Sequence, residues 1–395
     1  MATAASAVPL ASPTHRIPAR CRHFGICGGC LWQDMDYAGQ TAAKDAAVAR
    51  HLRDVVPPSV LRPIVPARDP WFYRNKMEFA FAPPAQLGLH ERGQWRRIVN
   101  LEECFLQSPA SAAIVRDVRA AVAARGLSCY DARTGKGLLR TLVIREAGGS
   151  GEAMVGFVTS RGPFPGAAAL AAMLATRYPQ LTSIVRGIVG ENTSAITDVE
   201  VLHGRDAIVE RVAGLRFQIG LTTFFQANTA QVEGMIALVD EFAALNSAAR
   251  VVDLYCGVGT FALALARRAR QVVGIDVGVA AIQAARANAA LNGIRNADFY
   301  AASSRAVQVL AGDVDPDVVV LDPPRAGAGP RVMDRIASLR PDRIVYVSCN
   351  PATLGADLRI LTAAGYAVTA VQPVDQFPQT PHVECIVQVK EHAAA

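Results

Sequence analysis

The sequence has no apolar run of the roughly 18 residues that a membrane-spanning helix needs. Residues 1–20 are rich in Ala, Ser and Pro, and they lack both the basic start and the clean apolar core of a signal peptide. We therefore expect a disordered tail over residues 1–20 and a cytoplasmic protein with no membrane partner. In that compartment the eight cysteines are expected to be reduced thiols rather than a disulfide framework.

Charged residues are scarce, at 19% of 395 residues, whereas hydrophobic residues make up 51%. Much of the hydrophobic fraction is Ala, which indicates Ala-rich helices rather than a membrane protein. A chain of this length is typical of two or three domains. The formal net charge of +6 favours an anionic partner, although net charge bears on association and not on fold.

The sequence also lacks the second C-x2-C pair that a zinc ribbon usually has. Instead, Cys21, Cys27 and Cys30 form C-x5-C-x2-C, with glycines that allow the backbone to wrap closely around a compact object. Cys104 follows far downstream. Four thiolates could hold an iron–sulfur cluster or a zinc ion, and three clustered ligands with one remote ligand favour the cluster. Three cysteines without such spacing are expected to pack in cores: Cys129, Cys256 and Cys385.

The first half of the chain indicates a β-rich region. Residues 71–99 alternate aromatic and basic side chains, which suits a single-stranded nucleic acid, although a half-buried sheet with a charged face explains this segment more simply. Short strands are also expected over residues 141–157 and 182–217. We expect a cluster region over residues 21–105 that merges with a β-rich, RNA-binding central domain over residues 45–218.

Regular alternation of strands and helices begins near residue 224 and indicates an α/β domain over residues 219–395. Helical patterns fall between the first six predicted strands, and only a short loop joins the last two, which predicts an antiparallel hairpin. Five parallel strands with this hairpin at the edge form a doubly wound sheet. The strands are predicted near residues 249–254, 271–276, 296–301, 316–322, 343–348, 366–372 and 384–390.

Reactive side chains follow the carboxyl ends of these strands, where ligands collect in open α/β sheets. Cys349 comes directly after an apolar strand that Asn350 and Pro351 end, so it lies at a strand-to-helix turn. The N-terminus of the following helix is expected to favour its thiolate. Asp322 follows a second strand. A thiol and a carboxylate are therefore expected to line one crevice.

A Gly-rich loop follows the first strand of this domain. Residues 257–262 fit G-x-G-x-x-A, and Asp276 ends the next strand, where a carboxylate binds ribose hydroxyls. This pattern alone fits a nicotinamide cofactor as well as S-adenosylmethionine. The large region before the loop favours S-adenosylmethionine, as does Asp253, an acid that methyltransferases use near the methionine moiety.

Taken together, the chain resembles the RNA uracil-C5 methyltransferases that carry an iron–sulfur cluster. The resemblance implies a Rossmann-like methyltransferase domain at the C-terminus, behind a β-rich central domain and an N-terminal iron–sulfur loop. The family's common N-terminal RNA-binding β-barrel is expected to be lacking, because there is no room for it before Cys21. The matching segments, in family order, are residues 21–30, 73–76, 224–228, 253–261, 322–327, 348–354 and 382–385.

The resemblance also implies roles for individual residues. Cys349 matches the nucleophile and Glu384 the base that removes a proton. Cys21, Cys27 and Cys30 lie in a matching segment, and together with Cys104 they are the expected ligands of a [4Fe-4S] cluster. Asp276 stands where the family usually has Glu, and Ser303 stands where a polar or acidic residue is expected near the adenine. The residues expected around S-adenosylmethionine are Gln226, Tyr255, Thr260, Asp276, Ser303 and Asp322.

The chemistry explains these residue types, because uracil C5 is too poor a nucleophile to take a methyl group directly. Addition of the Cys349 thiolate at C6 activates C5, and Glu384 then removes the C5 proton. Apolar neighbours predict partial burial of Glu384 and a raised pKa. The target uridine must leave its stack.

We expect a monomer that acts on RNA, with ribosomal RNA favoured over transfer RNA. Two functions of different classes also stay open, a nicotinamide-dependent oxidoreductase and a non-catalytic RNA-binding protein.

Overall fold

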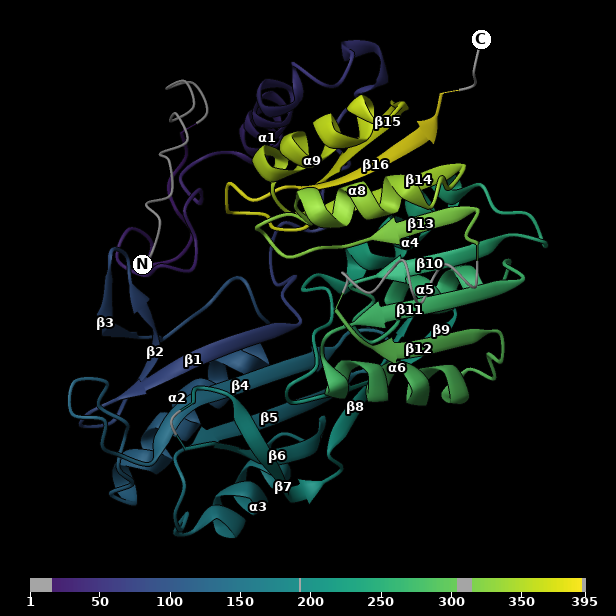
Figure 1. Ribbon diagram of the computed structural model, residues 1–395. Coiled ribbons are helices and arrows are strands. Elements are labelled where there is room, and N and C mark those ends of the chain that lie inside the picture. The colour runs from purple at the N-terminus through teal and green to yellow at the C-terminus, as the bar shows by residue number, and fades with distance from the viewer. Residues whose placement is uncertain (1–15, 192, 304–314, 393–395) are drawn as a thin grey trace.

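The computed structural model describes residues 16–191, 193–303 and 315–392. Two seven-stranded sheets and one two-stranded hairpin form the framework of this described part (Figure 1). This arrangement confirms the expected α/β class, because a β-rich central domain precedes a doubly wound C-terminal domain. None of the described helices is both long and apolar enough to cross a membrane.

The central sheet has the order β3-β2-β1-β4-β5-β6-β7, and its neighbours are antiparallel except for the parallel pair β5–β6. Met77, Phe79 and Phe81 alternate with less buried residues along β1, because successive side chains point to opposite faces. Helices α2 (Pro109–Ala124) and α3 (Ala167–Arg177) complete the core on that face. The strands are β1 (Lys76–Ala82), β2 (Gln86–Glu91), β3 (Gln94–Asn100), β4 (Leu139–Ala147), β5 (Glu152–Thr159), β6 (Leu181–Val189) and β7 (Ile196–Gly204).

The C-terminal sheet has the order β12-β11-β10-β13-β14-β16-β15. Its first five strands are parallel, and β16 pairs antiparallel with both β14 and β15, which confirms the expected hairpin. The last strand of the chain is thus inserted inside the sheet, with β15 at the edge. The strands are β10 (Arg250–Leu254), β11 (Gln271–Asp276), β12 (Ala297–Ala301), β13 (Val318–Leu321), β14 (Arg343–Ser348), β15 (Tyr366–Val374) and β16 (Glu384–Glu391).

Helices cover both faces of this sheet, as Figure 1 shows. Its strands are apolar on both faces because both are buried, so they read as nearly continuous apolar runs. Between β12 and β13, residues 304–314 of the expected helical segment lie outside the described residues. Helices α4 (Thr229–Ala243), α5 (Thr260–Ala266) and α6 (Val279–Leu291) cover one face, and α1 (Tyr37–Leu52), α8 (Pro330–Ser338) and α9 (Pro351–Ala363) cover the other.

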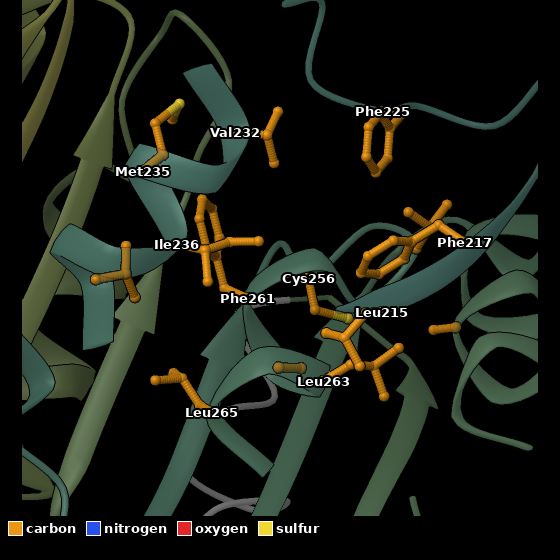
Figure 2. Packing of buried hydrophobic residues seen from close by; sticks show 14 of the residues in the cluster. Leu215, Phe217, Phe225, Val232, Met235, Ile236, Cys256, Phe261, Leu263 and Leu265 are labelled. Carbon is orange, nitrogen blue, oxygen red and sulfur yellow. The ribbon is translucent and has the colours of Figure 1, made fainter. Parts of the chain in front are cut away.

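A hairpin of β8 (Ala207–Val212) and β9 (Leu215–Gly220) lies between the two sheets. Figure 2 shows Phe217 of this hairpin beside Phe225 and Leu215 beside Leu263 of α5, and Val232 of α4 belongs to the same cluster. The same hydrophobic cluster includes Met154 of the central sheet. The core is therefore continuous from one domain to the other.

The N-terminal segment differs from the expected domain limits. The central domain was expected from residue 45, but Val48, Leu52 and Val56 pack with strands of the C-terminal sheet. The 3-10 turn η2 (Pro58–Val60) and single bridges to β15 continue this contact. The reason is that the apolar side of α1 covers α9 and the edge of that sheet, so the central sheet begins only at β1.

The end of the expected disordered tail is held by contacts to the following segment. Residues 1–15 lie outside the described residues, whereas Arg16 pairs with Asp34 and the Ile17 N–H donates to the Asp34 carbonyl at 3.0 Å. These two contacts fix residues 16–20 at their start. The ordered chain thus includes residues that precede the first cysteine.

Candidate active site

The turn after β14 carries Cys349. Asn350 caps α9 by accepting a hydrogen bond from the Ala352 N–H at 3.2 Å, and its amide donates to the Arg325 carbonyl at 2.9 Å. Pro351 is suited to the first helical position, where no N–H is needed. The turn is therefore held at the carboxyl edge of the sheet, as the sequence predicts.

The environment of Cys349 does not favour its thiolate, contrary to the expectation drawn from the helix N-terminus. Burial raises the pKa of Cys349, and together with the carboxyl groups of Glu384 and Asp322, and against a lowering by Arg325, it brings the pKa to about 11. A helix N-terminus contributes a small favourable field that burial among acids outweighs. The thiol therefore stays protonated at neutral pH until another group takes its proton.

Glu384 begins β16, the strand next to β14, and lies opposite Cys349. The antiparallel register of β14 and β16 pairs Ser348 with Cys385, so one further step along the ladder sets Cys349 opposite Glu384. Glu384 is 2% exposed. Burial raises its pKa well above the ordinary range, and Asp322 raises it further. Glu384 is thus buried more completely than the expected partial burial, and its pKa is raised as expected.

Asp322 and Gln226 complete this acidic group. The Gln226 side chain donates from Nε2 to Oδ2 of Asp322 at 2.8 Å, and the Asn75 side chain donates to the Gln226 carbonyl at 2.6 Å. Burial raises the pKa of Asp322 to about 7 even though the hydrogen bond from Gln226 lowers it. Two carboxyl groups with raised pKa values therefore flank the Cys349 thiol.

The Gly-rich loop follows β10 in a conformation that needs positive φ. Gly257 and Gly259 have φ of 54° and 86°, which glycine adopts without strain, and Tyr255 has φ of 61°. Asp276 accepts hydrogen bonds from the N–H groups of Gly257, at 3.1 Å, and Gly278, at 2.7 Å. Asp276 therefore fixes the loop as well as ending β11.

The remaining predicted cofactor residues lie around this loop. Thr260 is the first residue of α5 and is 7% exposed. Ser303 follows β12, directly after Ala302, whose N–H donates to the Asp276 carbonyl at 2.8 Å. Tyr255, Asp276 and Ser303 thus lie at the carboxyl ends of the parallel strands β10, β11 and β12, the edge where such sheets bind ligands. Gln226 reaches this edge from the segment before α4.

Asp253 carries an unused acceptor in this region. Its side chain is fully buried, Oδ2 accepts from the Ala262 N–H at 2.9 Å, and Oδ1 has no hydrogen-bond partner in the protein. Burial raises the pKa of Asp253 well above the ordinary range, and Asp322 and Asp276 add to the rise. A buried polar atom without a partner is costly, so Oδ1 fits a donor from a bound molecule.

The four cysteines expected to bind a cluster line one small pocket: Cys21, Cys27, Cys30 and Cys104. The Gly29 N–H donates to the Cys27 sulfur at 3.4 Å, and the Gln33 side chain donates to the Cys30 sulfur at 3.2 Å. Within the described ranges, no group of three or more His, Cys, Asp or Glu side chains is arranged to hold a single metal ion.

The three cysteines assigned to packing are buried: Cys129, Cys256 and Cys385.

Comparison with known proteins decides the family. Residues 192–392 match the family described as tRNA (Uracil-5-)-methyltransferase. The chain belongs to this tRNA (uracil-5-)-methyltransferase family. An uncharacterized RNA methyltransferase of Bacillus cereus is 34% identical, with 94% of this chain and 83% of that protein covered. One of Gloeobacter violaceus is 39% identical, with 96% of this chain and 84% of that protein covered.

A solved structure agrees with these relatives. The Pyrococcus abyssi tRNA (uracil-54, C5)-methyltransferase in complex with S-adenosyl-L-homocysteine superimposes with a TM-score of 0.77 at 31% identity. The match covers 92% of this chain and 86% of that one. The expected methyltransferase fold, enzyme class and S-adenosylmethionine chemistry are thereby confirmed. Membership of this family argues against the nicotinamide-dependent oxidoreductase that the Gly-rich loop alone left open.

Two residues beside the candidate site were assigned no role from the sequence. Gln376 is fully buried, and its amide donates to the Gln226 side chain at 3.5 Å. Asn75 reaches the same glutamine from the central domain. Both lie in loops without periodicity, so neither an apolar pattern nor a strand end points to them. Only Asn75 lies in a segment that matches the family.

Proposed function

We propose that the protein methylates C5 of a uridine in RNA, with Cys349 as nucleophile and Glu384 as the base. The observation that carries this proposal is the position of a buried carboxyl group opposite a thiol at the carboxyl edge of a methyltransferase sheet. A uracil ring between them would present C6 to the sulfur and the C5 proton to the carboxylate.

The steps assign one task to each residue. The Cys349 thiol gives up its proton to water, and its sulfur forms a bond to C6 while the electron pair of the C5–C6 double bond moves to C5, which becomes nucleophilic. Bound S-adenosylmethionine supplies the methyl group that C5 takes. Glu384 then removes the C5 proton, the C5–C6 double bond forms again, and the bond from C6 to sulfur breaks. Burial among apolar residues makes the Glu384 carboxylate a stronger base than it is in water, which suits proton removal from carbon.

The residues around the Gly-rich loop fit S-adenosylmethionine. Oδ1 of Asp253 is a free acceptor in a buried setting, and Asp276 keeps unused lone pairs after binding two N–H groups. Val277, directly after Asp276, is 68% exposed and offers an apolar surface next to the ribose position. The residues proposed to contact the cofactor are Gln226, Tyr255, Thr260, Asp276, Ser303 and Asp322.

We further propose that the cysteine pocket holds a [4Fe-4S] cluster. Four thiols in one pocket provide the full ligand set, and N–H groups directed at two of the sulfurs are the hydrogen bonds that such clusters use. The cluster would tie the Cys21–Cys30 loop to Cys104. That loop already pairs with β2, because the Gly28 N–H donates to the His90 carbonyl at 3.0 Å.

The hairpin of β2 and β3 is the proposed contact with RNA outside the catalytic site. Trp95 is 61% exposed, and the Arg96 guanidinium lies 4.9 Å from its ring centroid. Arg92 and Arg97 are exposed on the same hairpin. An exposed aromatic ring for base stacking beside cations for phosphates is the combination that binds single-stranded RNA. The buried aromatic residues of β1, by contrast, belong to the core, as the simpler explanation of this segment predicts.

The resemblance to the cluster-bearing methyltransferases favours ribosomal RNA as the target, and transfer RNA is the second candidate. The description of the family and the P. abyssi structure both name tRNA, which favours the second candidate. Mapping 5-methyluridine in ribosomal and transfer RNA from a strain without the gene separates the two, because only the substrate loses its methyl group. The cytoplasmic location and the monomeric state stay predictions.

The experiment that tests the proposed reaction is the Cys349→Ala substitution. It should abolish methyl transfer to uridine RNA while S-adenosylmethionine binding, followed by calorimetry, is unchanged. The unmodified protein should form a covalent complex with 5-fluorouridine RNA, because fluorine cannot be removed as a proton. A Cys349→Ala protein that methylates at a comparable rate would refute the mechanism.

A further inference from the structure

The loop between β15 and β16 leads directly into Glu384, and most of it is buried. Asp375, Gln376, Gln379 and Thr380 are each no more than 3% exposed. Loops normally lie at the surface, because a buried backbone must find a partner for each polar group. Many of the partners of this loop come from residues 31–67, more than 300 positions earlier in the chain. The shape of the loop therefore depends on that distant segment.

A buried ion pair fixes the start of the loop. Nζ of Lys44, on α1, lies 2.5 Å from Oδ1 of Asp375, and both side chains are 0% exposed. Nζ also donates to the Phe377 carbonyl at 3.0 Å, and the Tyr37 hydroxyl donates to Oδ2 of Asp375 at 2.9 Å. Burial lowers the pKa of Lys44, whereas Asp375 raises it. Each charge is thus matched by a partner, as a buried pair requires.

Gln379 is held further along the loop. Its N–H donates to the Gln40 side chain at 2.8 Å, and the Gln40 amide donates back to the Gln379 side chain at 3.0 Å. The N–H groups of Leu31 and Trp32 donate to the Gln379 carbonyl at 2.9 and 3.0 Å. Gln379 has φ of 66°, which is strained for a residue other than glycine, so these contacts sustain its conformation.

The same loop reaches the acidic group of the active site. Gln376, next to Asp375, donates to Gln226, and Gln226 donates to Asp322. The Asn228 amide donates to the Gln376 carbonyl at 3.4 Å. A continuous chain of contacts therefore runs from the Lys44–Asp375 pair to a carboxyl group that lies beside Glu384.

We propose that Lys44 is a positioning residue for Glu384: by pairing with Asp375, it fixes the loop that sets where the Glu384 carboxylate stands relative to Cys349. The inference rests on the proposed function of Glu384 as the base. Proton removal requires the base within hydrogen-bond reach of the C5 proton, and a small displacement slows that step. Thiol addition and methyl transfer do not use Glu384. Loss of Lys44 therefore affects elimination more than the earlier steps.

The test is to follow the covalent protein–RNA adduct in Lys44→Met. During turnover on uridine RNA this variant should accumulate the methylated adduct to about ten times the level of the unmodified protein or more. The adduct should be absent when Cys349→Ala is added. Val48→Ala is the matched control, because Val48 lies one turn along α1 and is fully buried in the core instead of contacting the loop. It should lower Tm without accumulating the adduct.

Asp375→Asn keeps the size of the side chain and removes its charge, so it weakens the hold of Lys44 on the loop and provides a second variant if Lys44→Met does not fold. It should also accumulate the adduct. Glu384→Gln is run beside both. If Glu384→Gln gives no adduct, the proposed base is wrong and this inference is overturned with it. If Glu384→Gln gives the adduct while the folded Lys44→Met and Asp375→Asn proteins do not, the inference alone is overturned and the ion pair only stabilises the fold.

Discussion

The Glu384→Gln substitution separates the two halves of the proposed reaction. Glutamine keeps the size of the side chain but cannot accept the C5 proton. Cys349 can still add to C6, and methyl transfer to C5 can still follow, because neither step uses the Glu384 carboxylate. The reaction should therefore stop after methyl transfer, with the RNA attached to the protein through Cys349.

The size of the effect follows from the role of the base. A positioned general base contributes typically 10²–10⁴-fold to a rate, so elimination should slow by about that factor, or about 3–5 kcal/mol in its barrier. Glu384 is buried, so bulk water does not readily replace it as a base. Elimination then limits turnover, and nearly all active protein should be in the adduct.

The assay is a denaturing gel with S-adenosylmethionine labelled in the methyl group. Glu384→Gln should give a shifted band that carries the label on ordinary uridine RNA, and the band should vanish in the double variant with Cys349→Ala. Glu391→Gln is the matched control, because Glu391 lies at the opposite end of the same strand and pairs with Arg340 at the surface. It should turn over normally.

Two outcomes would refute this reasoning. Loss of turnover without any adduct would mean that Glu384 acts earlier, in binding or in activating the thiol. Normal turnover of Glu384→Gln would mean that the carboxyl group takes no part in the chemistry.

The other predictions concern pH, the buried acids, the cysteine pocket and the RNA surface. Burial raises the pKa of Asp322 to about 7 and that of Cys349 to about 11. The rate of methyl transfer should therefore rise as the pH is raised from neutral into the alkaline range. A rate that falls over that range would contradict these raised pKa values. Asp253→Asn should weaken S-adenosylmethionine binding in calorimetry. It should also raise Tm above that of the unmodified protein, and the difference in Tm should grow as the pH rises above about 4. The reason is that Asp253 ionises in the unfolded chain above this pH, whereas burial disfavours its ionised form in the folded protein. A difference in Tm that does not change with pH would contradict the raised pKa. Protein purified without oxygen should contain about four irons per chain. Cys104→Ser should lower the iron content, whereas Cys129→Ser should leave it unchanged. Stoichiometric zinc without iron would contradict the cluster. Trp95→Ala should weaken RNA binding in a filter assay by about 1–3 kcal/mol with Tm unchanged, and unchanged affinity would exclude stacking on Trp95.

The C-terminal domain could be predicted closely from the sequence because its signals are local. Strands buried on both faces read as continuous apolar runs, and each predicted strand of the doubly wound sheet is present within a few residues. The motif residues come directly after those runs, so the sequence alone assigns Cys349 and Asp322 to the carboxyl edge. Burial of Glu384 could likewise be predicted from its apolar neighbours.

The central domain was less well defined. Alternation along β1 predicted a strand but could not tell core aromatic residues from RNA-binding ones. The reason is that a period of two residues shows that a strand has two different faces, but not what covers each face. Only the packed structure separates buried Phe79 from exposed Trp95. The expected boundary at residue 45 was wrong for the same reason: an amphipathic helix such as α1 shows that it has an apolar side, and not which sheet that side covers.

In the active site, the sequence predicts which residue types are present, and the tertiary structure decides which of them lie together. The chain itself determined the residue types, a thiol, carboxyl groups and a Gly-rich loop, and their places at strand ends. The insertion of β16 beside β14 decided that Glu384 stands opposite Cys349, and the burial of both decided their raised pKa values. The contact of Lys44 with Asp375 joins residues 331 positions apart. Such contacts arise from the packing of segments that are distant in the sequence. The pattern of apolar and polar residues along the chain indicates only which residues share a face of one helix or strand.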